Sequence, residues 1–467
     1  MQARVVAPEQ SRARGVALAA AVVVLGYYFF FTWKSLSLYF DQDDMMNLYL
    51  AWSKPLPDLL RANVLYWTDP LRPLGALFYR GVFAVAGFNP LPFRVACMAL
   101  GLLNLALCCW FVKLVTGSGR VMALAAMVFA FHTRLMEVWF RTAVIYDLIC
   151  FTFFYAAACL YISVRQKGEW PGRGRTIAIC LCFIAALDAK EVAVALPLVL
   201  IAWELVFAKF RWRNFALPVG LGLLAIPYAV TKAFGPNAIT ANPYYKPEYT
   251  LARFTETWGT FLGFLFVQPE PLQGRVVFVL LFVPLLIAAA VRSRKLLFAW
   301  ALLFIATLPM SFLPYRGGFV LYISYAGWAI YAGVVLGKGP EYAPPRWRTG
   351  AAAVLFLLVG WRLGKVNLHD QRFGTREWLY EPPRTVRALA EQMRAMHPTV
   401  APAARILLVE DAFATDEWTP VFILRLAYGN AKLVADRIKM MNPKPATWDG
   451  YDFVFTYQNG KYKQLKP

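Results

Sequence analysis

The stretch "VALAAAVVVLGYYFFFTW" (residues 16–33) decides the class of the fold, and "LSLYFDQDDMMNLYLAW" (36–52) follows it directly. The first stretch is apolar and uncharged. At about 1.5 Å per residue, a helix of this length crosses a hydrocarbon core about 30 Å thick. The second stretch places three carboxylates, Asp41, Asp43 and Asp44, where the chain leaves the membrane. Such a group of negative charges beside a membrane helix requires an explanation.

Similar apolar runs recur along the whole chain. Of its 467 residues, 59% are hydrophobic and 16% are charged, whereas a soluble domain carries about 25% charged residues. Ten-residue segments of alternating polarity, which would indicate a transmembrane barrel, are missing. We therefore predict an all-α polytopic membrane protein with about 11 transmembrane helices. The predicted spans are 16–33, 94–112, 120–133, 148–164, 176–187, 192–208, 214–231, 276–291, 296–313, 319–337 and 349–364.

The positive charge of the chain predicts its topology. The formal net charge is +21, which in a soluble protein would suggest nucleic acid. Here the basic residues gather in every second connection between apolar runs, so the positive-inside rule assigns those connections to the cytoplasm. We predict no nucleic-acid partner, a cytoplasmic N-terminus, an extracytoplasmic C-terminal domain and a place in the lipid bilayer of a bacterial inner membrane.

The first outer connection, residues 34–93, is the longest loop before the C-terminal tail, and it carries the acidic group. Two further apolar stretches, 74–88 and 257–267, lie inside outer loops. We interpret both as helices that lie on the membrane surface. The predicted organisation is a transmembrane domain over 1–366 and an extracytoplasmic domain over 367–467.

The tail has the pattern of a small α/β domain. "PPRTVRALAEQMRAMHP" (382–398) predicts an amphipathic helix that starts after Pro383, and "ARILLVED" (404–411) predicts a strand. "DFVFTYQNGKYKQL" (452–465) predicts a hairpin with Asn459-Gly460 as its tight turn. The acidic pair Glu410-Asp411 is interpreted as part of a solvated loop.

Ionisable residues gather at four outward-facing places, and we expect them to share one polar cavity. Two adjoining spans, 120–133 and 176–187, are short, so charges at their outer ends should lie below the membrane surface, where ionisable groups are usually functional. The alternative is a set of solvated loop charges. Besides the three aspartates, the residues at these places are His132, Arg134, Glu137, Arg141, Asp147, Lys190, Glu191, Arg316 and Tyr322. The spacing of Arg134, Glu137 and Arg141 would place them on one face of a helix.

The residue types suit a lipid-linked phosphate substrate. A carboxylate can take the proton of an acceptor hydroxyl, and Arg or Lys can hold a phosphate leaving group. We interpret His132 as a hydrogen-bonding side chain, because a metal-ligand partner at standard spacing is missing. The carboxylates of "DQDD" (41–44) are oxygen donors of the kind that a divalent cation takes. A divalent cation stays open, but a phosphate held by Arg and Lys requires none.

Four motifs carry a resemblance to a known family. They are "DD" (43–44), "RPLGALFYRGVFAVAGFNP" (72–90), the spaced set His132, Glu137 and Asp147, and "AKEVAVALPLVL" (189–200). The chain resembles the GT-C superfamily of membrane glycosyltransferases. Within it, the motifs resemble the transmembrane O-mannosyltransferase family that bears TPR repeats, although TPR repeats do not follow here. Thr133 and Ala189 replace residues that are usually Pro and Ser in that family.

The resemblance implies an inverting glycosyltransferase. The donor would be a polyprenyl-phosphate-linked sugar, and the acceptor would be an extracytoplasmic hydroxyl on a protein, a lipid or a glycan. It implicates Asp43 as the base or acceptor-orienting group, Asp44 in support and Asp41 as a third candidate. The other ionisable residues above, together with Arg72, become substrate-binding candidates. Two other classes stay open: a transporter of an anionic lipid or solute, and a non-catalytic membrane assembly protein.

Overall fold

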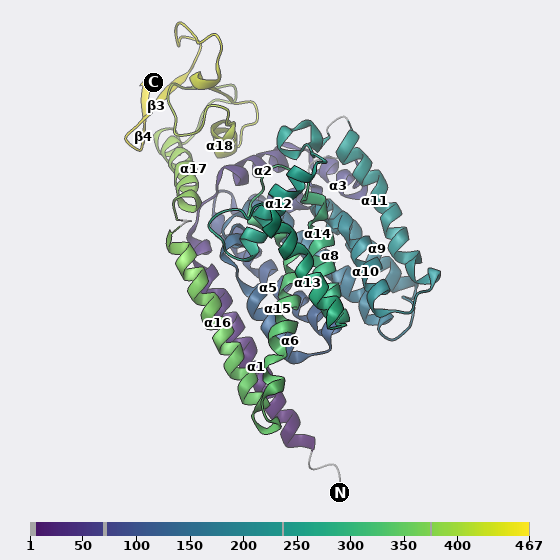
Figure 1. Cartoon of the computed structure of the whole chain (residues 1–467). Coiled ribbons are helices and arrows are strands. Elements are labelled where there is room, and N and C mark those ends of the chain that lie inside the picture. The colour runs from purple at the N-terminus through teal and green to yellow at the C-terminus, as the bar shows by residue number, and fades with distance from the viewer. Residues whose placement is uncertain (1–5, 69–71, 236–237, 374–375, 467) are drawn as a thin grey trace.

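A computed structural model describes residues 6–68, 72–235, 238–373 and 376–466. Helices dominate the described chain (Figure 1). Those of the first half are α1 (Val6–Thr32), α2 (Gln42–Ser53), α3 (Leu56–Val64), α4 (Pro73–Ala86), α5 (Pro90–Thr116), α6 (Gly119–Ala130), α7 (Glu137–Phe140), α8 (Ile145–Arg165), α9 (Arg173–Ala189) and α10 (Leu196–Phe207). Those of the second half are α11 (Ala216–Phe234), α12 (Leu251–Leu265), α13 (Arg275–Ala290), α14 (Arg294–Thr307), α15 (Tyr325–Gly337), α16 (Arg348–Phe373), α17 (Arg376–Met396) and α18 (Thr419–Ala427).

Each predicted span coincides with a helix, but the count of eleven membrane crossings is not confirmed. Within the described residues, five helical segments are long and apolar enough to cross a membrane. They are Arg14–Ser37, Pro90–Thr116, Thr142–Arg165, Trp212–Phe234 and Pro345–Gln371. Other runs form shorter helices. For example, α10 has 12 residues because the chain before it, Glu191–Ala195, is wound as a 3-10 turn. The chain nevertheless has the apolar helices of an integral membrane protein.

Capping residues fix where several of these helices begin and end. The Asn89 side chain accepts a hydrogen bond from the backbone N–H of Leu91 at the start of α5, and Pro90 follows at the first helical position. The same helix ends at Gly117, whose φ of 67° is the left-handed conformation that glycine adopts most easily. Ser118 then caps α6, so a single tight turn reverses the chain.

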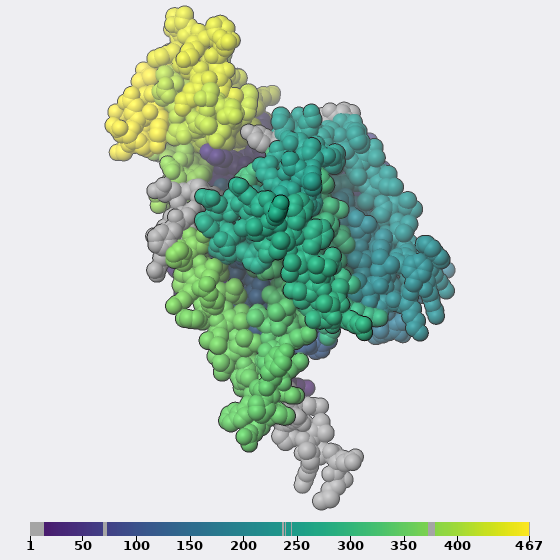
Figure 2. Space-filling view, viewed as in Figure 1, coloured from purple at the N-terminus to yellow at the C-terminus, as the bar shows by residue number. Residues whose placement is uncertain are grey.

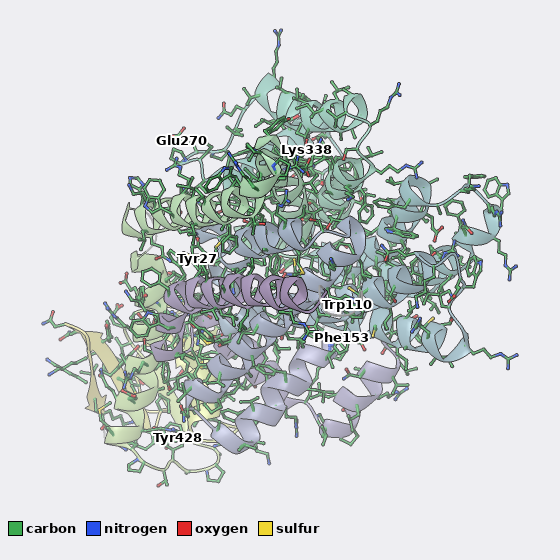
Figure 3. All side chains as sticks on the ribbon, turned by 90° about the horizontal axis from the view of Figure 1, so that it is seen from below. Tyr27, Trp110, Phe153, Glu270, Lys338 and Tyr428 are labelled. Carbon is green, nitrogen blue, oxygen red and sulfur yellow. The ribbon has the colours of Figure 1, made fainter. Side chains whose placement is uncertain are left out.

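The two longest helices pair along one side of the molecule. α1 and α16 lie side by side in Figure 1, and Tyr27 of α1 lies between them in Figure 3. Asn367 of α16 donates to the Tyr27 hydroxyl (2.7 Å) and accepts from the Thr133 backbone N–H (3.0 Å). The N-terminal half of α1 lies at one end of the molecule in Figure 1, and the C-terminal domain lies at the other end (Figures 1 and 2). This arrangement agrees with termini on opposite sides, and the topology itself stays a prediction.

The two apolar stretches predicted to be surface helices are also helical. Residues 74–88 form most of α4, and 257–267 overlap the second half of α12. α4 packs on α2 and α9, and its Gly75 has no room for a side chain, since a Cβ there would meet the Tyr146 ring at 2.0 Å. Whether these helices lie on the membrane surface or inside it stays a prediction.

The C-terminal domain is the predicted small α/β unit. Its sheet has the order β2-β1-β3-β4, with β1 (Arg405–Leu408) parallel to β2 (Val434–Arg437) and β3 (Phe453–Gln458), and with β3 antiparallel to β4 (Lys461–Lys466). Asn459 and Gly460 both have positive φ (51° and 78°), which is typical of the hairpin turn that the sequence predicts. The predicted strand and the predicted hairpin are therefore confirmed.

Two details of the domain differ from the sequence prediction. The helix α17 begins at Arg376 and continues through Pro382 and Pro383 instead of starting after them. Proline removes a backbone donor and disfavours the helix interior, but its fixed φ is close to the helical value, so the helix persists here. Asp411 is also not in a solvated loop: it is fully buried and receives two hydrogen bonds from Arg437 (2.8 and 2.9 Å).

Candidate active site

The acidic group forms the first turn of α2, and each of its aspartates has different surroundings. Asp41 is the N-cap: its Oδ1 accepts from the Asp44 backbone N–H (2.9 Å), while Asp44 Oδ2 accepts from the Asp41 N–H (3.0 Å). This reciprocal capping box satisfies donors that a helix start leaves without partners. Asp43 takes no part in the box, and 60% of its side chain is exposed. The sequence therefore uses two carboxylates to build the turn that presents the third.

Further contacts hold α2 in place. The buried Asp44 accepts a hydrogen bond from the Tyr79 hydroxyl (3.2 Å) and lies 3.6 Å from Arg94 Nη2. At the other end of α2, Arg80 of α4 donates to the carbonyls of Ala51 and Trp52 (both 3.3 Å). A cation at a helix C-terminus complements the partial negative charge of the last carbonyls. Both ends of α2 are thus tied to the neighbouring structure.

Arg141 connects this turn to the segment that follows the third predicted span. Its Nε lies 3.2 Å from Asp41 Oδ2, and its Nη1 lies 3.9 Å from Asp43 Oδ2 and 3.7 Å from Glu137 Oε2. One guanidinium therefore faces three carboxylates from two segments of the chain. It holds the Asp43 side of α2 against α7 and balances part of the local negative charge.

A cavity of about 650 Å³ opens next to Asp43 and brings together all four outward-facing places of the sequence prediction. Its lining combines ionisable and apolar side chains. The predicted site residues that line it are Asp43, Arg72, Glu137, Arg141, Asp147, Lys190, Glu191 and Arg316. Its apolar wall includes Met46, Val194, Leu198, Ile305, Leu308 and Val320. The cavity is amphipathic, as a site for a lipid-linked polar group should be.

Paired charges line this cavity. Arg72 donates two hydrogen bonds to Glu191 (3.0 and 3.2 Å), and Lys190 donates to both carboxylate oxygens of Asp147. The Arg316 guanidinium lies 3.9 Å from the centre of the Tyr245 ring, in cation–π geometry. Because arginine and lysine are fixed before any ligand arrives, they are positioned to bind an anion without large rearrangement.

The surroundings shift the acidity of several of these groups. Partial burial and the charge of Asp41 raise the pKa of the Asp43 carboxyl, and Arg141 opposes this shift. Burial also raises the pKa of Glu137 to about 7, again against the effect of Arg141. Burial would raise the pKa of Glu191 as well, but the adjacent Arg72 lowers it to about 2. Asp43 and Glu137 are therefore more basic than ordinary carboxylates, whereas Glu191 stays ionised.

Three predicted binding residues lie outside the cavity. His132 is buried, accepts a hydrogen bond from the Arg134 backbone N–H at Nδ1 (3.3 Å) and packs against Tyr325. Arg134 forms an ion pair with Asp370 (2.8 Å). Tyr322 is 1% exposed and packs among Phe129, Phe151 and Trp139 in the helix core.

The expected single helix face for Arg134, Glu137 and Arg141 is wrong. Arg134 belongs to a 3-10 turn, Thr133–Leu135, and α7 ends at Phe140, so that Arg141 has an extended backbone (φ −120°, ψ 128°). The prediction from their spacing required an unbroken helix over residues 134–141. The breaks turn Arg134 toward α16, while Glu137 and Arg141 face the cavity.

Other lining residues were not anticipated from the sequence. Lys232, in the last turn of α11, is 6% exposed and lies 5.3 Å from the Tyr228 ring centre. The Tyr146 hydroxyl donates to Asn47 Oδ1 (3.1 Å) and so joins α8 to α2. Lys232 directly follows the apolar run 214–231, at its predicted outer end. This position could have indicated Lys232 as a site residue. Tyr146 and Asn47 gave none, because neither is unusual at its position.

Two glycines allow the segment that carries Arg316 to approach the site closely. A Cβ on Gly317 would lie 2.6 Å from Glu137 Oε1, and a Cβ on Gly318 would lie 1.9 Å from the Arg134 carbonyl oxygen. A side chain at position 318 would collide with a backbone atom, whereas one at position 317 would require the flexible Glu137 carboxylate to move. Close packing of this segment against Arg134 therefore requires the second glycine of "RGG" (316–318).

The helix α7 separates the cavity from a second hollow of about 1150 Å³. Glu137 and Arg141 line the first cavity, whereas Met136 and Phe140 line the second. The second hollow lies between the outer ends of α1 and α16 and the C-terminal domain, and its lining residues include Phe31, Lys34, Leu379 and Arg384. Of the predicted site residues, none lines this hollow within the described chain.

The described residues contain no group of three or more His, Cys, Asp and Glu side chains arranged to hold a metal ion. Around "DQDD", Asp41 and Asp44 accept backbone hydrogen bonds, and Arg141 lies beside Asp41 and Asp43. The Arg141 guanidinium thus lies beside the carboxylates that would have to bind a cation. These carboxylates are better suited to pairing with Arg141 than to binding a metal ion.

The solved structures that are similar to this chain include two of one protein. One is the crystal structure of ArnT from Cupriavidus metallidurans bound to undecaprenyl phosphate, with 15% identity, a TM-score of 0.49 and coverage of 91% of this chain and 90% of that chain. The other is the same protein in the apo state, with 17% identity, a TM-score of 0.48 and coverage of 91% and 90%. No protein-family model and no curated protein matches the chain. The resemblance to the O-mannosyltransferase family stays a prediction from the motifs.

Proposed function

We propose that the protein is an inverting membrane glycosyltransferase of the GT-C type. It moves a sugar from a polyprenyl-phosphate donor to a hydroxyl of an extracytoplasmic protein, lipid or glycan. The observation that carries this proposal is the cavity of about 650 Å³, in which one exposed carboxylate, several fixed cations and an apolar wall meet. A transporter of an anion would also line its cavity with cations, so sugar transfer, which a transporter does not perform, separates the two classes.

The cations of the lining favour one orientation of the donor. Its phosphate lies at Arg72, Lys190 and Arg316, because arginine and lysine bind phosphate through charge-assisted hydrogen bonds. Its prenyl chain lies along the apolar wall, which includes Leu198 and Ile305. The sugar then projects toward Asp43, where an acceptor can enter from the outer side.

The chemical step is a single displacement. The acceptor oxygen forms a bond to the anomeric carbon on the face opposite the phosphate, and its proton moves to the Asp43 carboxylate. The bond between the anomeric carbon and the phosphate oxygen breaks, and its electron pair leaves with the phosphate. The cations stabilise the negative charge that develops on the phosphate. One displacement inverts the configuration at the anomeric carbon.

Binding of polyprenyl phosphate tests the donor site. The purified protein in nanodiscs is titrated with polyprenyl phosphate, and binding is measured for Lys190→Gln and Arg316→Gln. Each variant should bind at least about tenfold more weakly, as expected for the loss of one charge-assisted hydrogen bond. Arg61→Gln is the matched control, since Arg61 is an exposed cation on α3 and does not line the cavity. Normal affinity in both cavity variants would remove the chemical basis of the proposal.

A further inference from the structure

The C-terminal domain contacts the helix that carries Asp43. In Figure 1 the helix α18 of this domain lies next to α2, with which it is in contact, and in Figure 2 the domain lies at one corner of this end of the helical body. α2 also packs on α4. The helix therefore contacts both the helical body and the C-terminal domain.

We name three residues of this contact, Tyr49, Phe422 and Arg425, the docking contact. The ring of Tyr49 on α2 is stacked on Phe422 of α18, with ring centres 4.8 Å apart and an angle of 17° between the planes. The Tyr49 hydroxyl accepts a hydrogen bond from Arg425 Nη1 (2.8 Å). Arg425 also donates through Nε to the Leu433 carbonyl (3.0 Å), so its guanidinium is fixed within the domain.

The domain also comes within electrostatic reach of Asp43 itself. Arg437 holds the segment before α18, because it donates to Asp411 and to the carbonyls of Phe413 and Ala414 (3.3 and 2.8 Å). Glu417 stands in the same segment, and the Asp43 charge is one of the groups that act on the Glu417 carboxyl. The segment before α18 is therefore held by Arg437, and its Glu417 is close enough for the charge of Asp43 to contribute to the raised pKa of the Glu417 carboxyl.

We propose that the C-terminal domain positions the catalytic helix α2, and that Tyr49 is the positioning residue through which it acts. The inference rests on the proposed function, since it assigns Asp43 the role of base. Tyr49 does not line the cavity, so it acts only through the placement of α2. A displacement of about 1 Å at a reacting group can cost about 10²-fold in rate, so a contact that fixes this helix controls the chemical step.

Kinetics of docking-contact variants provide the test of function. Tyr49→Ala and Phe422→Ala should lower kcat by at least about tenfold, while the affinity for polyprenyl phosphate stays within about twofold. Tyr49→Phe keeps the ring stack and loses only the hydrogen bond, so its loss of kcat should be smaller. Arg387→Ala is the matched control, because Arg387 is an exposed cation on α17 of the same domain. A kcat unchanged in Tyr49→Ala and Phe422→Ala would overturn the inference.

The pH profile separates positioning from general damage. Asp43 is surrounded by charged groups on each packed element: Asp41 and Asp44 on its own segment, Glu137 and Arg141 at α7, and Glu417 in the C-terminal domain. A displaced α2 changes this set, so the acid limb of the rate profile should move in Tyr49→Ala. An acid limb identical to that of the wild type, with a lower rate, would mean that Tyr49 acts only on the amount of folded protein.

Hydrogen exchange distinguishes a failure of this inference from a failure of the proposed function. The backbone amides of residues 42–53 are followed in the full-length protein in nanodiscs. Exchange should be faster in Tyr49→Ala and Phe422→Leu than in the wild type, and unchanged in Arg387→Ala. Faster exchange in the two variants would support the positioning role even if the wild type transfers no sugar. In that case only the proposed function would be wrong. Unchanged exchange in both docking-contact variants contradicts the positioning role.

Discussion

At the scale of single residues, three neighbouring aspartates perform different tasks because their partners differ. Asp41 and Asp44 exchange hydrogen bonds with each other's backbone N–H, and Asp44 is completely buried. Asp43 alone reaches the cavity with an exposed side chain. The sequence could therefore predict an acidic site here and favour Asp43 through a family resemblance. It could not show that its two neighbours build the helix start, since capping depends on backbone geometry.

The charge of Asp41 provides a test of the role of Asp43. Asp41→Asn keeps a side-chain oxygen for the cap but removes a negative charge that raises the pKa of Asp43. The base must be deprotonated, so the acid limb of kcat/KM should lie above the value of about 4 of an ordinary aspartate. In the variant the pKa of Asp43 falls, and activity should extend to lower pH. A limb that stays in place, or moves upward, would contradict this assignment.

At the scale of elements, the long helices could be predicted from apolar runs, whereas the broken segments between them could not. Residues 133–144 look like one amphipathic helix in sequence, but they fold as two 3-10 turns around the short α7. The breaks depend on tertiary contacts, such as the bond between Asn367 and the Thr133 backbone. For the same reason the sequence grouped Arg134 with Glu137, although the fold turns Arg134 toward Asp370.

The segment at Gly318 gives a prediction at this scale. Gly318→Ala places a Cβ against the Arg134 backbone carbonyl, so the Arg316 segment must shift. We expect a loss of about 1–3 kcal/mol in the free energy of unfolding and weaker binding of polyprenyl phosphate. Gly350→Ala in α16 is the control, since a Cβ there meets nothing within 4 Å, and it should be neutral or stabilising. Thermal unfolding of both variants checks this; equal stability would show that the close approach is not required.

At the scale of the whole molecule, the account depends on the C-terminal domain and Asp43 being on the same, extracytoplasmic side. The alternation of basic connections predicts this topology from the sequence, and the docking contact of Tyr49 with the domain agrees with it. The packing of the domain on α2 itself could not be predicted. Neither Tyr49 nor Arg425 is unusual in its own segment, and only the fold brings them together.

Cysteine labelling in intact cells tests this topology. A cysteine placed at the exposed Lys461, in the hairpin of the C-terminal domain, should react with a membrane-impermeant thiol reagent. A cysteine at the exposed Lys167, in a connection predicted to be cytoplasmic, should react only after lysis. The wild type, with its seven native cysteines, gives the background. Labelling of position 461 only after lysis would place the C-terminal domain on the cytoplasmic side. The domain and Asp43 would then not share the extracytoplasmic side.

The most direct test of the central claim is sugar transfer by Asp43→Asn. The purified protein is incubated with polyprenyl-phosphate-linked sugars and membrane-derived acceptors, and the release of polyprenyl phosphate is measured. Asp43→Asn should fold and bind polyprenyl phosphate normally, while transfer falls by about 10²- to 10⁴-fold, as expected for the loss of a general base. Asp58→Asn, at an exposed aspartate of α3, should transfer at the wild-type rate. A near-normal rate in Asp43→Asn, beside an active wild type, would contradict the assignment of this cavity as the active site.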